Sequence, residues 1–141
     1  MINTKLTRKA MIIAYEAHKN QVDKSGVPYI YHPIHVAEQM DTENECIIAL
    51  LHDVVEDTNV TFKQLEYVIS KEILDILKLL TREENIEYDE YIKRIKNNSI
   101  ACKVKIADLT HNLDKTRLDF VTEVDVKRNE KYKKALQILY Y

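Results

Sequence analysis

Apolar residues recur every three or four positions along most of the chain, which is the spacing of one buried face of an α-helix. Two capping boxes, Thr42 to Glu45 and Thr61 to Gln64, mark places where helices begin. The pattern predicts helices over residues 4–20, 34–40, 42–57, 61–80 with a break near residue 70, 88–97, 99–114 and 125–141.

The composition supports an all-helical fold. The chain of 141 residues contains one glycine and two prolines, far fewer turn-forming residues than a strand-and-turn architecture needs. A hydrophobic share of 45% is enough for a substantial core, and no repeat or linker divides the sequence. We therefore expect an all-α helical bundle in which residues 1–141 form a single domain.

The charge balance limits the expected partners. Lys and Arg number 21 and Asp and Glu number 23, so the net charge is −2, and neither nucleic acid nor an anionic membrane is an expected partner. No apolar run approaches the roughly 18 residues of a membrane span, and the N-terminus lacks a signal-peptide pattern. Cys46 and Cys102 lie inside helical apolar patterns, as small core residues do. A cytoplasmic protein is expected.

The candidate chemistry begins in the stretch Ile47–Asp57, where five apolar residues lead into His52, Asp53, Glu56 and Asp57. On one continuous helix, at about 100° per residue, all four ionisable side chains share an arc of about 140°. The rest of that helix is apolar, so it should be buried, and buried charges need partners or a metal ion. The stretch therefore predicts a metal site. The alternative is an ordinary helix with a charged solvent face.

The only glycine and both prolines fall within residues 21–33, which predicts a stiff loop. Pro33 is placed to open the next helix at its first position. One interpretation of the loop is an ordinary connection between helices. The other is the wall of a site, with Lys24 and Ser25 for an anionic ligand and His32 for a metal. The loop alone does not choose between them.

The helix over residues 99–114 places Asp108, Lys105 and Asn112 on one side. A carboxylate flanked by an ammonium and an amide suits a surface that faces a ligand, with His111 as a candidate partner of a metal ligand. The alternative is a plain amphipathic helix in which Asp108 pairs with Lys105. The ligand-facing interpretation requires this helix to pack beside residues 42–57.

The last helix shows less chemistry. Asp125 is the expected N-cap of this helix, because aspartate is a preferred residue at that position. Arg128 and Tyr132 lie one turn apart and are expected to be ordinary surface residues.

Four motifs stand in order along the chain: Tyr-Ile-Tyr-His-Pro ending at Pro33, Leu-Leu-His-Asp-Val-Val-Glu-Asp-Thr ending at Thr58, Val-Lys-Ile-Ala-Asp ending at Asp108, and His-Asn-Leu ending at Leu113. Together they resemble the HD-domain metal-dependent phosphohydrolases. More narrowly, they resemble the alarmone hydrolase branch, which comprises the hydrolase half of Rel/SpoT proteins and the small stand-alone (p)ppGpp hydrolases. The resemblance covers residues 10–113.

The resemblance implies an HD-domain helical bundle, a divalent metal ion, typically manganese, and removal of the 3′-pyrophosphate from guanosine tetra- and pentaphosphate. It implies metal ligands at His32, His52, Asp53 and Asp108, a catalytic acidic pair at Glu56 and Asp57, and nucleotide contacts at Lys24, Ser25 and Asn112. Two imidazoles and two carboxylates suit Mn²⁺, Fe²⁺ or Zn²⁺. Lys105 would add positive charge for the phosphates of a nucleotide.

Two positions depart from the family pattern. Asp23 stands where the family often has a basic residue, and Leu109 replaces a basic residue after Asp108. Both changes reduce the positive charge available to a polyphosphate. The leading hypothesis is a (p)ppGpp 3′-pyrophosphohydrolase. The alternatives are an HD nucleotidase or nucleotide phosphatase with another substrate, and a non-catalytic nucleotide-binding regulatory module. A homo-oligomer is possible for the family, although no residue pattern here predicts one.

Overall fold

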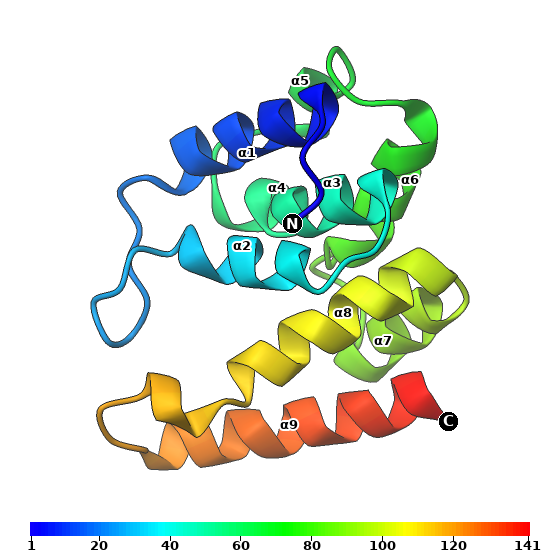
Figure 1. Cartoon of the computed structure of the whole chain (residues 1–141). Coiled ribbons are helices and arrows are strands. Elements are labelled where there is room, and N and C mark those ends of the chain that lie inside the picture. The colour runs from blue at the N-terminus through cyan, green and yellow to red at the C-terminus, as the bar shows by residue number, and fades with distance from the viewer.

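The computed structural model describes all 141 residues, and the chain forms nine α-helices and one 3₁₀ turn (Figure 1). The prediction of an all-α fold is confirmed. The helices are α1 (Lys5–His18), α2 (Tyr31–Glu38), α3 (Glu43–Leu51), α4 (Val54–Asp57), α5 (Phe62–Leu65), α6 (Lys71–Leu80), α7 (Tyr88–Lys96), α8 (Ser99–Asn112) and α9 (Glu123–Tyr140), and the 3₁₀ turn is Lys115–Arg117.

Helix α3 lies at the centre of the bundle because residues 46–51 are apolar on every side of it. Residues 46–51 are all buried, and the helix packs against α1, α2, α6 and α8. Cys46 is one of these buried residues and Cys102 is half-buried, and both are free thiols, as the sequence predicts. The core therefore forms around the segment that leads directly into His52 and Asp53.

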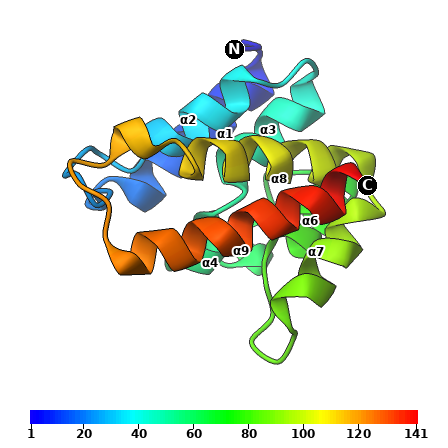
Figure 2. The ribbon, with the colours of Figure 1, turned by 90° about the horizontal axis from the view of Figure 1, so that it is seen from below.

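Helix α8 connects the two halves of the molecule. It packs against α2 and α3 on one side and against α7 and α9 on the other, and Figures 1 and 2 show it between α2 and α9. The ligand-facing interpretation of Asp108 requires α8 to pack beside residues 42–57, and α8 does pack against α3. No helix combines the length and the apolar character that crossing a bilayer would require.

The predicted continuous helix over residues 42–57 is wrong. Helix α3 ends at Leu51, Asp53 adopts φ −104° and ψ −3°, and α4 begins at Val54. Val54 is buried, whereas Glu56 and Asp57 are exposed. The break keeps Val54 in the core and brings the two acids to the surface. A straight helix through the core would have to desolvate both carboxylates, which is costly without partners.

Helix ends elsewhere follow local capping. Thr42 caps α3 and Thr61 caps α5 through a full capping box, as predicted, although the Glu45 carboxylate accepts from the Asp41 N–H rather than from Thr42. The N-cap of α9 is Thr122, and the predicted cap Asp125 is instead the third residue of the helix and completes the capping box. Thr122 takes the cap position because its hydroxyl accepts from the Asp125 N–H while Asp125 accepts from Thr122.

Pro33 lies at the third position of α2 instead of the first, because α2 begins at Tyr31. This position is still tolerated, since the first N–H groups of a helix have no intrahelical acceptor and proline loses nothing there. His32 therefore belongs to the first turn of a helix and not to the preceding loop.

The central position of α3 gives a stability prediction. Replacing the fully buried Leu50 with alanine (Leu50→Ala) should lower the free energy of unfolding by about 2–5 kcal/mol, because a cavity would remain in a packed core. In the matched control Val124→Ala, at a side chain that is 69% exposed, the change should stay within about 0.5 kcal/mol. Urea denaturation measures both, and equal effects would contradict the placement of α3.

Candidate metal centre

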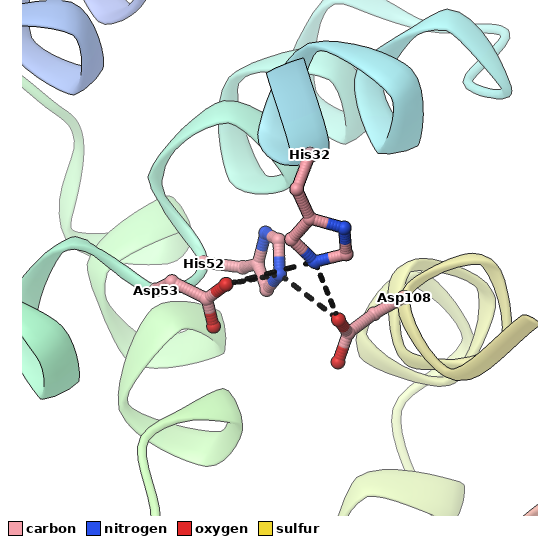
Figure 3. A group of neighbouring side chains, drawn as sticks. All are labelled: His32, His52, Asp53 and Asp108. Carbon is pink, nitrogen blue, oxygen red and sulfur yellow. Dashed lines mark hydrogen bonds and ion pairs between the residues drawn. The ribbon is translucent and has the colours of Figure 1, made fainter. Parts of the chain in front are cut away.

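Four side chains from three helical segments meet at one point. His32 comes from α2, His52 and Asp53 from the turn between α3 and α4, and Asp108 from α8 (Figure 3). One potential ligand atom from each residue lies within 4.8 Å of all the others. The structure thus brings together all four residues that the sequence motifs indicate as metal ligands, although 76 residues separate the first from the last.

The spacing of these atoms suits a single ion. His32 Nε2 lies 2.8 Å from Asp108 Oδ1, and His52 Nε2 lies 3.0 Å from Asp53 Oδ2. The cross-distances are 3.4 Å from His52 to Asp108 and 3.7 Å from His32 to Asp53. Two ligands at about 2.1 Å from one ion and at right angles would be about 3.0 Å apart. The four donors could therefore share a divalent cation without large movement.

His52 is oriented for coordination by its other nitrogen. Nδ1 donates to the Ala49 carbonyl at 2.6 Å, which leaves Nε2 directed at the two carboxylates. Nε2 is buried and makes no hydrogen bond. Against the opposing effect of burial, Asp53 raises the pKa of His52 well above its ordinary value. A bound cation would compete with a proton for Nε2, so metal binding at this nitrogen should release that proton.

His32 is held by a second histidine. Its Nδ1 lies 2.7 Å from Nδ1 of His111, and the planes of the two rings are almost parallel. Burial, together with the charge of Arg117, lowers the pKa of His111 to about 4, so His111 is neutral near pH 7. Its Nδ1 can therefore accept a hydrogen bond from the Nδ1–H of His32. His35 stacks on the other side of His111 at 3.9 Å between ring centroids. This arrangement leaves Nε2 of His32 facing Asp108.

Both carboxylates of the cluster are held in their charged form. Burial alone would raise the pKa of Asp53, but the neighbouring His52 lowers it to about 2. Lys105 likewise holds the pKa of Asp108 well below its usual range against the effect of burial. An anionic pair next to two imidazoles is a donor set that attracts a divalent cation.

Tyr29 is a member of the site that motif reasoning missed. Its hydroxyl donates to Asp53 Oδ2 at 2.5 Å, and its ring contacts the rings of His18 and His32. Burial and the charge of Asp53 raise the pKa of Tyr29, so the phenol keeps its proton and remains a donor. The signal was present in the Tyr-Ile-Tyr-His-Pro motif, which begins at this residue.

Lys105 and Asn112 both contact Asp108. Lys105 Nζ donates to Oδ2 at 2.9 Å, and Asn112 Nδ2 donates to Oδ1 at 3.1 Å. The intrahelical pair of Asp108 and Lys105, the alternative that the sequence left open, is present. Both contacts orient Asp108 toward the cluster, while Leu109, one residue later, is fully buried in the core.

Glu56 and Asp57 lie outside the four-residue cluster on α4. The Glu56 carboxylate accepts from the Arg82 N–H at 3.1 Å, and the Asp57 carbonyl accepts from the side chain of Gln21. Partial burial, followed by the charge of Asp53, raises the pKa of both carboxyls above their ordinary values. The proximity of Asp53 gives these two acids a higher proton affinity than free carboxylates have.

The loop before α2 is fastened to the first turn of α9 and to the 3₁₀ turn before it. Lys24 Nζ donates to Asp125 Oδ1 at 2.5 Å, and the Ser25 hydroxyl donates to the Arg117 carbonyl at 2.6 Å. Asp23 accepts from two backbone N–H groups of the turn that Gly26 makes at φ 81°. Asp23 therefore shapes the loop, and the Ser25 hydroxyl serves to tie the loop down.

A cavity of about 310 Å³ lies between this loop and α9. Lys24, Asn112 and Tyr29 are among its lining residues, and so are Arg128 and Tyr132. The expectation that Arg128 and Tyr132 are ordinary surface residues is therefore wrong. They lie one turn apart on the face of α9 that lines the cavity. Their spacing is visible in the sequence, but only the packing of α9 shows that both residues line a cavity.

Each basic residue of this cavity has an acidic partner. Asp125 pairs with both Lys24 and Arg128, the second at 3.2 Å, and Asp23 lies 3.7 Å from Arg117. The cavity wall is rich in hydrogen-bond donors but has little net positive charge. Asp125 is almost fully buried, and Lys24 holds its pKa well below the usual range.

The family follows from a comparison with known proteins. The HD domain model matches residues 10–104, which is most of the chain. The chain belongs to the HD domain family. The resemblance that the four motifs indicated is thereby confirmed, and the His52–Asp53 pair at the centre of the cluster is the pair that the motif reasoning started from.

Several curated relatives are similar to this HD domain chain. It is 30% identical over 124 residues to the bifunctional (p)ppGpp synthase/hydrolase SpoT of Escherichia coli, covering 77% of this chain and 18% of SpoT. It is 34% identical over 124 residues to the guanosine-3′,5′-bis(diphosphate) 3′-pyrophosphohydrolase MESH1 of Danio rerio, covering 79% of this chain and 69% of that protein. The chain thus spans less than a fifth of the bacterial relative and most of the fish one.

A solved structure shows the same fold. The structure, described as a metazoan ortholog of SpoT that hydrolyses ppGpp, superposes with a TM-score of 0.81 at 23% sequence identity. The match covers 99% of this chain and 88% of that one. The HD-domain architecture extends through α9, beyond the residues that the family model matches.

The buried Asp125 gives a pH prediction. Asp125→Asn keeps the acceptor for Thr122 but removes the charge that pairs with Lys24, so the variant should have a lower Tm than the wild type at pH 7. Because the native pKa of Asp125 is depressed, its contribution is present above the ordinary pKa of about 3.9 and is lost as the pH falls below it. The difference in Tm should therefore shrink below about pH 4.

Thermal unfolding between pH 3 and pH 8 measures this difference, with the exposed Asp119→Asn as the matched control that should not change Tm. A difference between wild type and Asp125→Asn that stays constant across this range would show that the ion pair does not stabilise the fold.

Proposed function

We propose that this protein hydrolyses guanosine 3′,5′-bis(diphosphate) at its 3′ position, in a reaction that depends on manganese. The observation that supports the proposal most strongly is the convergence of His32, His52, Asp53 and Asp108 beside Glu56 and Asp57, in a chain that covers 69% of a relative named for that activity. Water would supply the oxygen, the bond between phosphorus and the 3′ oxygen would break, and GDP and pyrophosphate would leave.

His32, His52, Asp53 and Asp108 would hold the ion. When bound, a divalent metal polarises a phosphate oxygen and lowers the pKa of a coordinated water. The contacts around these residues support the assignment, because His111 orients His32, Ala49 orients His52, and Tyr29 orients Asp53. Neighbours of this kind fix ligand direction and raise ligand basicity in metalloproteins.

The choice of manganese rests on the family resemblance together with the donor types. Two imidazole nitrogens and two carboxylates are compatible with Mn²⁺, Fe²⁺ and Zn²⁺, and donor type alone does not separate them. Four protein ligands would leave room on an ion of higher coordination number for water and a phosphate oxygen, and the ion could then supply catalytic chemistry as well as structural support.

Glu56 would accept a proton from the attacking water, with Asp57 assisting. Its pKa is raised by partial burial and by Asp53, which makes it a better proton acceptor than a free carboxylate. The backbone N–H of Arg82 fixes one carboxylate oxygen and leaves the other free. The proton would then pass to the 3′ oxygen of the leaving GDP.

The cavity beside the cluster would bind the nucleotide. Lys24 and Arg128 carry positive charge, Asn112 offers an amide, and Tyr132 offers an aromatic face. Lys105, which is hydrogen-bonded to Asp108, would add positive charge near the phosphates of the nucleotide. Ser25 has its hydroxyl committed to Arg117 and would act by holding the loop.

A second candidate substrate is another phosphorylated nucleotide that carries less charge. The observation that favours it is the pairing of Lys24, Arg117 and Arg128 with Asp125 and Asp23, which leaves little net positive charge in the cavity for a polyphosphate. The same catalytic residues would serve either substrate.

Product release tests the proposal. With Mn²⁺ the wild type should convert ppGpp to GDP and pyrophosphate, and chelator should abolish the reaction. Asp53→Asn should remove metal-dependent turnover, and Glu56→Gln should lower kcat by about 10²–10⁴-fold, as expected for loss of a general base. Asp119→Asn, an exposed substitution of the same kind, should leave the rate unchanged.

Turnover of GTP, dNTPs, NADPH or a nucleoside monophosphate, without turnover of ppGpp, would contradict ppGpp as the substrate. The assignment of the catalytic residues would still stand. Manganese binding with no turnover of any of these nucleotides would contradict hydrolysis altogether and leave a regulatory binding module as the better account.

A further inference from the structure

Basic side chains gather around Tyr88, the first residue of α7. The Lys131 ammonium lies 4.0 Å from the centre of the Tyr88 ring, and the Arg82 guanidinium lies 5.5 Å from it. Lys105 lies 5.4 Å from the neighbouring ring of Tyr91. The cations come from three different segments: the loop after α6, helix α8 and helix α9.

Arg82 and Lys131 differ from the basic residues of the loop cavity in having no acidic partner. Lys24, Arg117 and Arg128 are each paired with a carboxylate. Lys131 makes no ion pair, and Arg82 donates from Nε and Nη2 only to the carbonyl of Ile86. The uncompensated positive charge near the site is therefore at Tyr88 and not in the cavity.

The two cations are exposed and held in place. Arg82 donates two hydrogen bonds to the Ile86 carbonyl, and both cations lie against the Tyr88 ring. These contacts restrict both side chains, so little side-chain entropy is lost when a ligand binds. Burial, and then the charges of Arg82 and Lys105, lower the pKa of Lys131. Mutual repulsion of this kind is relieved when an anion binds between the cations.

The position of this pair connects it to the catalytic residues. The Arg82 backbone N–H donates to the Glu56 carboxylate, and Lys105 pairs with the metal-cluster residue Asp108. A ligand that reaches Arg82 and Lys131 would therefore pass beside Glu56. A nucleotide with phosphates on both sides of its ribose has the chemistry to occupy the metal cluster and this pair together.

We propose that Arg82 and Lys131 form a second anion-binding subsite, which takes the diphosphate group of the substrate that does not lie at the metal cluster. This inference rests on the proposed function for the identity of the substrate. Each cation would donate charge-assisted hydrogen bonds to the phosphate oxygens, and Tyr88 would hold both side chains in position.

Binding of the product GDP to the manganese-loaded protein tests the subsite without turnover. Isothermal titration of GDP should give a Kd about tenfold higher for Lys131→Met and for Arg82→Met than for the wild type, since each loses a charge-assisted contact. Methionine keeps the length of Lys131 and its packing on Tyr88. Lys131→Arg should retain the wild-type affinity, and guanosine, which has no phosphate, should bind all variants equally.

The matched control is Lys133→Met, which removes the same charge from an exposed position of the same helix without contacting Tyr88. GDP affinity that is the same in Lys131→Met and Lys133→Met would overturn the subsite. It would also be overturned if these variants lost affinity for inorganic pyrophosphate but kept their affinity for GDP. A loss of GDP affinity at Arg82 and Lys131 in a protein that fails to hydrolyse ppGpp would support the subsite and contradict the proposed reaction.

Discussion

The placement of two carboxylates beside two imidazoles in the interior is the constraint on which the rest of the structure depends. Asp53 and Asp108 are largely removed from water, and a carboxylate in such surroundings is unstable without compensating charge or hydrogen bonds. The protein supplies part of this compensation through Lys105, Asn112 and Tyr29. The two imidazoles supply the rest, together with whatever cation the four groups share.

This constraint explains the arrangement of the helices. The apolar helix α3 carries His52 to the centre, and its end at Leu51 lets Asp53 turn toward the cluster while Glu56 and Asp57 reach the surface. Helix α8 must lie against α2 for Asp108 to meet His32. Helix α9 then closes the other side of α8, and its first turn is joined to the loop before α2 through Asp125. The acids at the surface of α4 thereby face a site whose walls come from both halves of the chain.

Sequence reasoning found most of this site because its ligands lie in short motifs. His52 and Asp53 were identified from the abrupt change from apolar to ionisable residues, whereas Asp108 was assigned as a metal ligand through the family resemblance. The end of α3 was not found, because a helical wheel assumes one continuous helix. Tyr29 was missed because its partner Asp53 lies 24 residues away. Arg128 gained its meaning only from tertiary packing, since a charged residue on a terminal helix is usually solvated.

The central claim is that His32, His52, Asp53 and Asp108 bind one divalent ion. Anomalous diffraction at the manganese absorption edge, from crystals grown with Mn²⁺, tests it most directly. The account predicts one strong anomalous peak at about 2.0–2.3 Å from Nε2 of both histidines and from one carboxylate oxygen of each aspartate. A peak elsewhere in the molecule, or none at this cluster with manganese present in excess, would contradict it.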